Sequence, residues 1–380
     1  MSRYFHGFHI RELSQIKGLI LAGGFGTRLR PLSCSRPKLL FPIAGRTMIE
    51  WILSELSENG VDTAILATNY MSNEIRKYLG RKFEGVKLFY SLEDEPLGTG
   101  GAIKKAEKFF KKSEDFIVFN GDIISFPPIK EILNKHVSNK AITTIMLHKV
   151  KDPTHFGVVE LDKSTKVLNF IEKPSLESTT SKWINAGVYI MNIKAFDYIV
   201  PNKKISIERD IFPKLASSGK LFGHKYRGEW FDIGRFNEYR KANSTILSRI
   251  SKHKPMISDI VKINENSDLV PPLSLGSNSI IRKNVIIGPN VSIGKHVVIG
   301  ERSKISNSIL FDHVILGRNS NVRGAVIGEG VVIGNRVRIQ KDCVIGDHVY
   351  ISDNVLLKKN IQICPHKEIK SSIEHEGVVV

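Results

Sequence analysis

The C-terminal part of the chain has a regular six-residue rhythm of apolar residues, and no other feature of the sequence constrains its fold as strongly. Only two steps shorten to five, before Leu316 and before Ile327. Glycine often follows the apolar residue directly, as at Gly276 and Gly288. Such self-similarity indicates a repeat fold, in which stacking of coils buries the apolar side chains that a single coil would leave exposed. The apolar series is Leu275, Ile281, Ile287, Ile293, Ile299, Ile305, Phe311, Leu316, Val322, Ile327, Ile333, Ile339, Ile345, Ile351, Leu357 and Ile363.

This rhythm resembles the hexapeptide repeat of the left-handed β-helix. In that fold a short strand turns a corner every sixth residue, a branched side chain fills the interior, and a small residue eases the corner. An antiparallel β-sandwich would instead need turn-marked segments of about 8 to 12 residues. We therefore expect a left-handed β-helix domain with a C-terminal tail at 275–380, and a linker at 252–274 that contains Pro255, Pro271 and Pro272.

Strand-like and helix-like patterns alternate in the first two thirds of the chain. Strands are expected at 18–22, 64–67, 86–91 and 116–120, and helices at 48–59 and 99–110. This alternation predicts an α/β domain at 17–251, with a Rossmann-like, mostly parallel sheet covered on both faces. Ligands bind beyond the carboxyl ends of the strands in such sheets.

The composition narrows the possible functions. A chain of 380 residues with 41% apolar and 25% charged residues is expected to form two domains, without a membrane-spanning segment. The N-terminal extension, residues 1–16, lacks the apolar core of a signal peptide, so a cytoplasmic location is expected. Acidic residues are interspersed within the net charge of +18, which disfavours nucleic-acid binding. The three cysteines show neither disulfide nor metal-ligand spacing.

A glycine-rich turn follows the first expected strand. Its backbone amides are expected to bind the phosphates of a nucleotide. A dinucleotide fold would need a third glycine where Leu29 stands, and a Walker-type loop would need Lys followed by Ser or Thr. Arg28 and Lys38 add two cations suited to a triphosphate. The expected nucleotide-binding residues of this turn are Leu21, Ala22, Gly23, Gly24, Gly26 and Thr27.

The segments GGFGTRLRP and RPKLLFPIAG resemble the signature of the nucleoside-diphosphate-sugar pyrophosphorylases. The likeness continues in EPLGT, NGD, FGV, EKP, NAG and WFDIG, and it covers nearly the whole chain from residue 17. Within the family, PLGT, SIE, FP and the tail CPHKEI are most similar to the mannose-1-phosphate guanylyltransferases of the β-subunit type.

This resemblance implies that Asp122 and Asp232 hold Mg²⁺, an ion that prefers carboxylate oxygens. Without the resemblance, Asp122 could shape a turn and Asp232 could cap a helix. Lys173 is implied to bind the sugar phosphate and to act with Arg28 and Lys38 in catalysis. Glu172 is implied to bind the sugar hydroxyls. The remaining implied residues are Gly157, Asn185 and Gly187 at the sugar phosphate and Gly98 and Thr99 at the nucleobase.

The implied reaction is Mg²⁺-dependent nucleotidyl transfer from GTP to mannose-1-phosphate by a homo-oligomer assembled through the β-helix. Uridylyl or thymidylyl transfer to glucose-1-phosphate remains an alternative, because those enzymes share the same motifs. A non-catalytic subunit that senses GDP-mannose is a second, and an acyltransferase using His296, His313 or His348 is a third. Gly100, Gly101 and Cys34 depart from the guanylyltransferase pattern and leave the base open.

Overall fold

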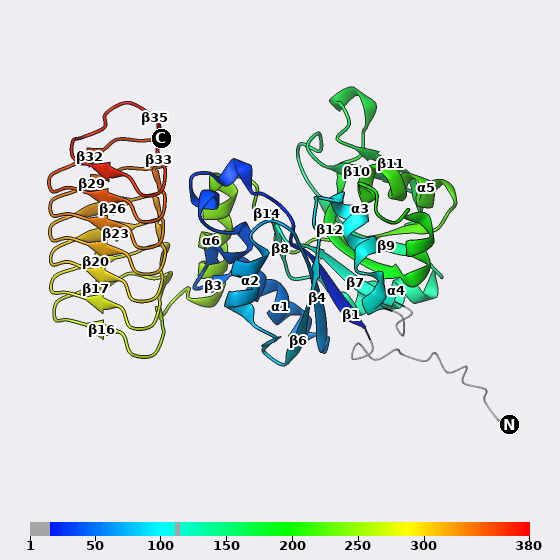
Figure 1. Ribbon diagram of the computed structural model, residues 1–380, viewed down its shortest axis with the longest axis horizontal. Coiled ribbons are helices and arrows are strands. Elements are labelled where there is room, and N and C mark those ends of the chain that lie inside the picture. Colours follow the sequence, from blue (N-terminus) through cyan, green and yellow to red (C-terminus); the bar gives the residue numbers. More distant parts are fainter. Residues whose placement is uncertain (1–15, 111–114) are drawn as a thin grey trace. The chain divides into compact units, whose positions relative to one another are not determined.

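The structure is a computed structural model that describes residues 16–110 and 115–380 (Figure 1). The chain divides into two units. The first comprises the chain up to Gly24 together with Ile49–Trp230, and the second comprises Phe25–Met48 and Phe231–Val380. The predicted N-terminal extension lies outside the described residues except for Ile16. No helix in the described ranges has the length and apolar character needed to cross a membrane.

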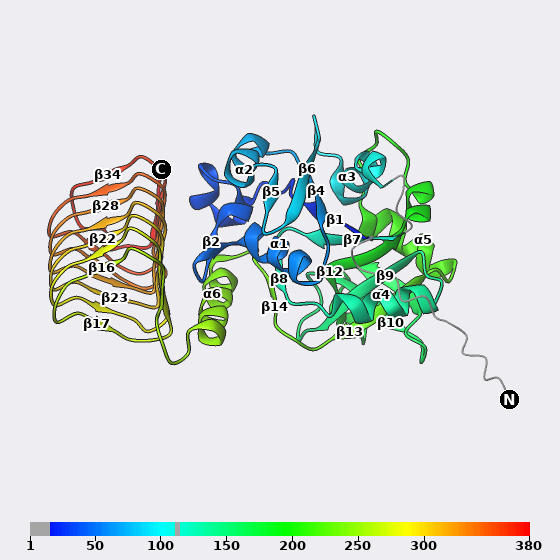
Figure 2. The ribbon, with the colours of Figure 1, turned by 90° about the horizontal axis from the view of Figure 1, so that it is seen from below.

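A ten-stranded sheet forms the centre of the first unit, with helices packed around it (Figures 1 and 2). Strands β7-β1-β4-β6 run parallel, with Gly18 opposite Ala64 and Ile117. All four strands predicted from the sequence are present, and the predicted α/β fold is confirmed. The strands are β1 (Lys17–Leu21), β4 (Thr63–Thr68), β5 (Lys82–Phe83), β6 (Val86–Leu92), β7 (Asp115–Asn120), β9 (Thr143–Lys149), β10 (Gly157–Leu161), β11 (Val167–Glu172), β12 (Trp183–Asn192) and β13 (Leu221–Tyr226).

The rest of this sheet depends on the long strand β12, which pairs antiparallel with β7, β9 and β10. The pairing of β12 with β9 shifts register between Asn185 and Tyr189, where extra residues bulge out of the strand. A bulge of this kind bends a strand and re-aims its side chains. Both residues belong to the site described below.

Helices follow the strands in the first unit. Helix α1 (Met48–Glu58) confirms the helix predicted at 48–59. The helix predicted at 99–110 is wrong in its last turn. It ends as α3 (Gly98–Lys105), and a 3₁₀ turn at Glu107–Phe109 then brings Phe110 into the core, 4.5 Å from the ring of Phe116. The other elements are α2 (Ser72–Leu79), β8 (Ile123–Ser125), α4 (Ile129–Ser138), a π turn (Ile207–Ile211), α5 (Phe212–Ser217) and 3₁₀ turns at Leu176–Ser178 and Ile193–Tyr198.

The second unit contains a β-helix of short strands stacked in three parallel sheets of eight, seven and six strands. This is the arrangement of the left-handed β-helix, so the predicted fold is confirmed. The stack includes strands from Met256 onward, within the stretch predicted to be the linker.

The strands of the three sheets are as follows. The first contains β15 (Met256–Ile257), β18 (Leu273–Leu275), β21 (Val291–Ile293), β24 (Ile309–Leu310), β27 (Val326–Ile327), β30 (Val344–Ile345), β33 (Ile361–Ile363) and β35 (Gly377–Val379). The second contains β16 (Lys262–Ile263), β19 (Ile280–Ile281), β22 (Val298–Ile299), β25 (Ile315–Leu316), β28 (Val332–Ile333), β31 (Tyr350–Ile351) and β34 (Glu368–Ile369). The third contains β17 (Asp268–Leu269), β20 (Ile286–Ile287), β23 (Lys304–Ser306), β26 (Asn321–Arg323), β29 (Arg338–Ile339) and β32 (Leu356–Leu357).

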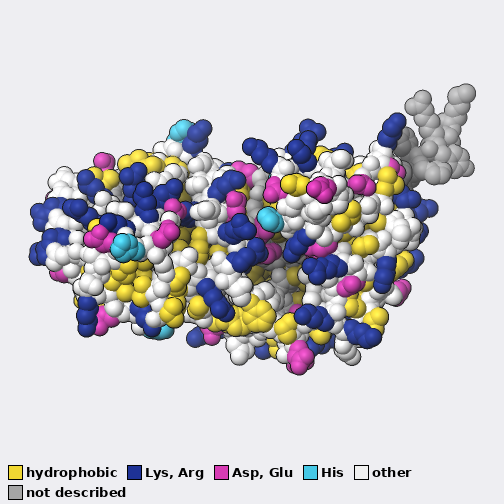
Figure 3. Space-filling view, turned by 90° about the horizontal axis from the view of Figure 1, so that it is seen from above, with side chains coloured by type: hydrophobic (Ala, Val, Ile, Leu, Met, Phe, Trp, Pro, Cys, Tyr) yellow, Lys and Arg dark blue, Asp and Glu magenta, His cyan; other side chains and the backbone are white. Residues whose placement is uncertain are grey.

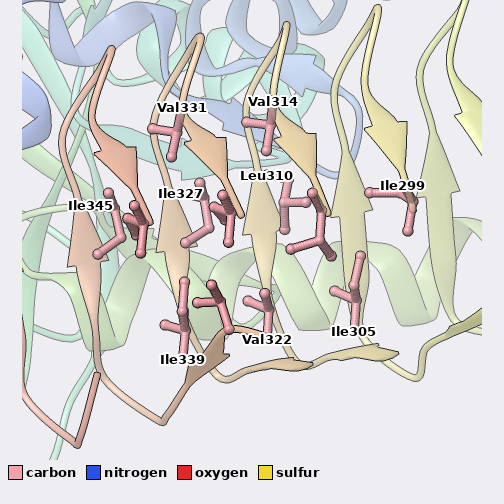
Figure 4. Close-up of a cluster of buried hydrophobic side chains, with 14 of the residues drawn as sticks. Ile299, Ile305, Leu310, Val314, Val322, Ile327, Val331, Ile339 and Ile345 are labelled. Atoms are coloured by element: carbon pink, nitrogen blue, oxygen red, sulfur yellow. The ribbon is translucent and has the colours of Figure 1, made fainter. Parts of the chain in front are cut away.

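The apolar series fills the interior of the β-helix, as Figure 4 shows for Ile299, Ile305 and their neighbours. One member is different. Leu310, and not Phe311, takes the interior position, in register with Ile293 and Ile327. The first five-residue step therefore lies between Ile305 and Leu310. Phe311 is buried on the outer side, where its ring meets the ring of Phe41 at 5.8 Å.

The corners of the β-helix are made by residues with a left-handed backbone, three positions after most interior side chains and two positions after Ile305 and Val322, where the step is five residues. Asn278, Asn284 and Asn290 begin this series, with φ near 60°. Asparagine tolerates this conformation better than most residues. The glycines that follow the interior residues serve a different purpose from the one predicted, since a Cβ at Gly276 would lie 2.4 Å from the backbone of Gly294 in the next coil. They allow close stacking of coils.

Helix α6 (Phe236–Ile250) and the segment 25–48 pack on the first sheet of the β-helix within the second unit. The outward-facing side chains Ile309, Val326 and Val344 are consequently buried. The segment contains short 3₁₀ turns and a two-stranded hairpin. These elements are Thr27–Leu29, Leu32–Cys34, Lys38–Leu40, β2 (Pro42–Ile43) and β3 (Arg46–Thr47), and β14 (Trp230–Asp232) precedes α6.

We expect substitution of an interior residue to weaken the β-helix strongly. Ile333→Ala should lower the free energy of unfolding by roughly 2–5 kcal/mol, because the neighbouring coils cannot close the cavity. The exposed Lys304→Ala serves as the control and should change it by less than about 0.5 kcal/mol. Urea unfolding of the two variants measures the difference, and equal losses would contradict the interior assignment of Ile333.

Candidate functional site

The glycine-rich turn begins where β1 ends, and its first residues are tied into the sheet. The amide of Ala22 donates to the carbonyl of Ala67 at 2.7 Å, and the carbonyl of Leu21 accepts from the amide of Gly121 at 3.0 Å. Leu21 and Ala22 thus fix the start of the turn. A Cβ at Gly24 would meet no atom within 4 Å, so the backbone there is open to a ligand.

Glu93, which was not predicted as a site residue, faces this turn. A Cβ at Gly23 would lie 3.5 Å from Oε1 of Glu93, whose Oε2 accepts a hydrogen bond from the amide of Leu97 at 2.9 Å. Asn69 donates to the carbonyl of Glu93 at 3.0 Å and completes the cluster. Burial raises the pKa of the Glu93 carboxyl above its usual value. Its position directly after a strand is the signal that could have identified it.

The start of α3 is packed tightly against residues 203–208. A Cβ at Gly98 would lie 2.6 Å from the carbonyl oxygen of Ile205, and one at Gly101 would lie 2.7 Å from the carbonyl oxygen of Lys203. The amide of Gly100 donates to the same Ile205 carbonyl at 2.8 Å. Gly100 and Gly101, which depart from the family pattern, are therefore required here by a close approach of two backbones.

Thr99 connects this helix start to the partly buried acid Glu208. Its hydroxyl donates to Oε2 of Glu208 at 2.6 Å and accepts from the amide of Ile207 at 2.9 Å. Ser206 donates to the same carboxylate at 2.8 Å. The side chain of Thr99, predicted to lie at the nucleobase, is thus occupied in holding Glu208 in place.

The bulge of β12 places Asn185 and Gly187 at one edge of the sheet. Asn185 Oδ1 accepts from the amide of Gly187 at 3.0 Å, and its Nδ2 donates to the hydroxyl of Tyr189 at 3.0 Å. Asn120, the last residue of β7, lies beside the bulge, since a Cβ at Gly187 would approach its Nδ2 to 3.0 Å. The indole of Trp230 donates to the carbonyl of Ala186 at 2.9 Å and so supports the bulge from outside. Asn120 and Tyr189 were not predicted as site residues.

Glu172 lies at the end of β11 opposite Gly157, as the register of β10 and β11 requires. A Cβ at Gly157 would approach Oε2 of Glu172 to 2.9 Å. Burial, followed by the charge of Glu208, raises the pKa of Glu172. Burial, followed by the charge of Glu208, also raises the pKa of Tyr189 well above its usual value, so the charge of Glu208 reaches both Glu172 and Tyr189. Lys173 has a left-handed backbone and a 57% exposed side chain, with Nζ 4.0 Å from Oε1 of Glu172.

Asp122 follows β7 after Gly121, at the carboxyl end of the parallel strands. Two residues before it, Asn120 Oδ1 is buried and accepts no hydrogen bond from any described residue. Among residues 16–110 and 115–380, no group of three or more His, Cys, Asp or Glu side chains could hold a metal unaided. Any metal at Asp122 would take its remaining ligands from other sources.

The second unit brings together the other predicted residues. Gly26 has a left-handed backbone (φ 60°), and a Cβ there would lie 3.4 Å from the Cβ of Lys38. Ser33 holds this turn by donating to the carbonyl of Gly26 at 2.8 Å. The guanidinium of Arg28 lies over Gly234, where a Cβ would be 3.0 Å from Nη2. Asp232 is part of the same turn, since its carbonyl accepts from the amide of Gly234 at 2.8 Å. Thr27 follows Gly26 and is the first residue of the 3₁₀ turn Thr27–Leu29, which contains Arg28.

Two family models together match nearly the whole chain. The nucleotidyl transferase family model matches residues 17–249, and the model of the GMPPB C-terminal domain matches residues 254–379. The mannose-1-phosphate guanylyltransferase catalytic subunit beta of Dictyostelium discoideum is 35% identical over 96% of this chain and 100% of its own length.

Two solved structures are similar to the first part of the chain. HddC from Yersinia pseudotuberculosis complexed with GMP-PN has a TM-score of 0.53 and 30% identity, and covers 61% of this chain and 99% of its own. A putative glucose-1-phosphate thymidylyltransferase from Bacillus anthracis has a TM-score of 0.56 and 27% identity, covering 60% of this chain and 94% of its own.

Two glycine variants test how tightly the β12 bulge is built. Gly187 and Gly60 both have a positive φ, but a Cβ at Gly187 would lie 2.8 Å from Ile123, whereas one at Gly60 would meet no atom within 4 Å. Gly60→Ala should therefore cost only the backbone strain, about 1–2 kcal/mol. Gly187→Ala should cost a further ~1–3 kcal/mol from the clash. Urea unfolding measures both, and equal losses would contradict the close packing of the bulge.

Proposed function

Because the chain belongs to the nucleotidyl transferase family and is a sugar-1-phosphate nucleotidyltransferase, we propose that it forms GDP-mannose and diphosphate from GTP and mannose-1-phosphate. The observation that carries this choice of substrates is the similarity to the Dictyostelium guanylyltransferase subunit over 96% of this chain and the full length of that protein. The match of residues 254–379 to the GMPPB C-terminal domain supports the same choice.

Mannose-1-phosphate is proposed to bind in the first unit, beside Glu172 and Asn185. Glu172 and Asn185 supply acceptors and donors for sugar hydroxyls, and Gly157 and Gly187 leave the space that a Cβ would fill. Burial and, after it, the charge of Glu208 raise the pKa of Glu172, and hydrogen bonds from sugar hydroxyls would stabilise its ionised carboxylate. Lys173 is proposed to bind the sugar phosphate, because its side chain is 57% exposed and its ammonium group lies 4.0 Å from Oε1 of Glu172.

The triphosphate of GTP is proposed to bind the glycine-rich turn. The amides of Gly23, Gly24 and Gly26 would donate to its oxygens, and Arg28 and Lys38 would neutralise the charge that develops on the leaving diphosphate. These two cations are held by their own surroundings, Arg28 over Gly234 and Lys38 beside Gly26. Such preorganised charge lowers the barrier because it needs no rearrangement during the reaction.

The reaction needs no protein nucleophile and no general base. An oxygen of the sugar phosphate, already largely ionised near neutral pH, attacks the α-phosphorus of GTP. The bond from that phosphorus to the oxygen bridging the β-phosphorus breaks, and diphosphate leaves with the electron pair. Catalysis then consists of alignment and charge neutralisation by Arg28, Lys38 and Lys173.

Mg²⁺ is the proposed cofactor, and the donors of the chain fit it. Asp122 and Asp232 offer hard carboxylate oxygens, and a pair of carboxylates leaves coordination positions for water and phosphate oxygens, as Mg²⁺ requires. When bound, the ion would neutralise phosphate charge and polarise the phosphoryl group.

Glu93 supports the choice of guanine. Its carboxylate accepts hydrogen bonds but donates none, and it lies beside Gly23 at the start of the phosphate turn. Guanine presents two adjacent donors, N1–H and the 2-amino group, on its Watson–Crick edge. Uracil and thymine present a single donor between two carbonyl oxygens, which a carboxylate would repel.

The alternatives have less support. The exposed His296, His313 and His348 occupy left-handed corners of the β-helix, which is a structural position and gives an acyltransferase no acid–base pocket. Lys and Arg side chains are spread among acidic ones on the face seen in Figure 3, which does not favour a nucleic-acid surface. We retain assembly through the β-helix into a homo-oligomer as part of the proposal.

A matrix of nucleotides and sugar phosphates tests the substrates. We expect diphosphate release to be fastest with GTP and mannose-1-phosphate, compared with UTP or dTTP and with glucose-1-phosphate. Glu93→Gln should reduce kcat/KM for GTP by about 10- to 100-fold relative to UTP, because an amide donor replaces one of the two acceptor oxygens that face the donors of guanine. Faster wild-type turnover with glucose-1-phosphate and UTP or dTTP would overturn the proposed substrates.

Removal of a carboxylate tests the proposed metal ligands. Asp122→Ala should abolish Mg²⁺-dependent formation of GDP-mannose and leave the midpoint of thermal unfolding close to that of the wild type. Asp197→Ala, which removes an exposed carboxylate, is the matched control and should retain full activity. Near-normal turnover of Asp122→Ala would exclude Asp122 as a metal ligand.

A further inference from the structure

The turn that carries Lys38 is anchored directly to the β-helix on its N-terminal side. The hydroxyl of Ser35 donates to Oδ2 of Asp347 at 2.8 Å. The guanidinium of Arg36 forms an ion pair with Glu329, and its Nε lies 3.7 Å from Oδ2 of Asp347. Both acids come from consecutive coils of the β-helix. They therefore bind the two residues that precede the Pro37-Lys38 pair.

Besides its ion pair with Glu329, Arg36 packs against an aromatic ring of the β-helix. Its guanidinium lies over the ring of Phe311 at 5.1 Å from the centroid, and its side chain is only 17% exposed. Phe311 in turn contacts Phe41 edge-on. Arg36 and Phe41 stand on either side of the 3₁₀ turn Lys38–Leu40, so one outward-facing ring of the β-helix supports both ends of that turn. This use explains why Phe311 points outward and Leu310 inward.

A second anchor follows Phe41 and runs through α6. Tyr239 donates to the carbonyl of Pro42 at 2.5 Å. Asn243 Oδ1 accepts from the amide of Ala44 and from the hydroxyl of Ser292, each at 2.8 Å, and so links the segment to the first sheet of the β-helix. The turn bearing Lys38 is thus held before and after by groups that belong to, or bind, the β-helix.

The position of Lys38 affects the phosphate turn as well. Its Cβ lies 3.4 Å from where a Cβ of Gly26 would be, and Ser33 is bonded to the carbonyl of Gly26. A shift of the Ser35–Arg36 backbone would therefore move Lys38 and Gly26 together. Misplacement by about 1 Å can cost a reaction of this kind roughly 100-fold in rate.

We propose that Arg36, Glu329 and Asp347 are positioning residues for nucleotidyl transfer, through which the β-helix holds Lys38 where it neutralises the triphosphate. This rests on the proposed function, which gives Lys38 that role. Asp347 is suited to the task because it is itself fixed, as its Oδ1 accepts from the amide of Glu329 at 2.7 Å and its side chain is 5% exposed. Loss of Arg36 would leave this buried carboxylate without its cation.

The test uses the full-length enzyme with Arg36→Gln, Asp347→Asn and the double variant. Asparagine can keep the corner bond to the amide of Glu329 while losing the charge that faces Arg36. The matched control is Asp353→Asn, because Asp353 makes the same corner bond to the amide of Asn335 at 2.8 Å but is exposed. Kinetics are measured with whichever substrate pair the wild type uses best, so that an error in the proposed substrates does not affect the result.

Each single variant should lose about 10- to 100-fold in kcat. The KM for the sugar phosphate should stay within about twofold, because its proposed pocket is built from other residues. The double variant should lose no more than the worse single variant, since both changes break one interaction. Asp353→Asn should match the wild type in kcat. Circular dichroism should show all four variants folded under the assay conditions, with Arg36→Gln the least stable of the single variants because it leaves the carboxylate of Asp347 without its cation. Unchanged kcat in the single variants, or losses that multiply in the double variant, would overturn the proposal.

Hydrogen exchange provides a readout that is independent of turnover. The amides of Leu40 and Phe41 close the Lys38 turn by donating to the carbonyls of Pro37 and Lys38, each at 2.9 Å. They should exchange faster in Asp347→Asn than in Asp353→Asn. Equal exchange would overturn the anchoring. Failure of the proposed function would show differently, as a wild-type preference for other substrates with the same dependence on Asp347.

Discussion

The distance between stacked coils is the constraint on which the second unit depends. Coils approach so closely that a side chain at Gly328 would lie 2.4 Å from Oδ1 of Asp347. Glycine at this position leaves room for Asp347 of the next coil to accept a hydrogen bond from the amide of Glu329. The same aspartate then receives Ser35 and faces Arg36. A requirement of coil stacking thus also produces the fixed acceptor to which the Lys38 turn is attached.

The fold of each unit could be predicted well because it depends on local periodicity. The six-residue rhythm requires one apolar residue per interior position, and the α/β alternation requires buried strands between helices. Periodicity could not choose between Leu310 and Phe311, because both are apolar and adjacent. The choice depends on Arg36 and Phe41, which are far away in the sequence and require the outward ring. The role of the glycines that follow the interior residues could not be predicted either, because it depends on the backbone of the next coil.

The candidate site could be predicted only where it consists of short motifs. The glycine-rich turn and the Glu172-Lys173 pair were recognisable because each is continuous in sequence. Glu93, Tyr189 and Glu208 were not predicted as site residues, because their places depend on sheet register, on the β12 bulge and on the packing of 203–208 against α3. Such pairings are set by tertiary structure, and one sequence carries no direct record of them.

Gly100 and Gly101, which depart from the family motif, show how a sequence motif and tertiary packing are related. In the sequence they leave the base specificity open, whereas in the structure they allow the 203–207 backbone to approach α3 and bring Glu208 to the hydroxyl of Thr99. Burial and, after it, the charge of Glu208 raise the pKa of the Glu172 carboxyl. The two glycines therefore influence a residue of the proposed sugar site, and the choice of base is better sought at Glu93. A departure from a family motif can thus reflect the packing behind a site, while other residues are the ones proposed to contact the ligand.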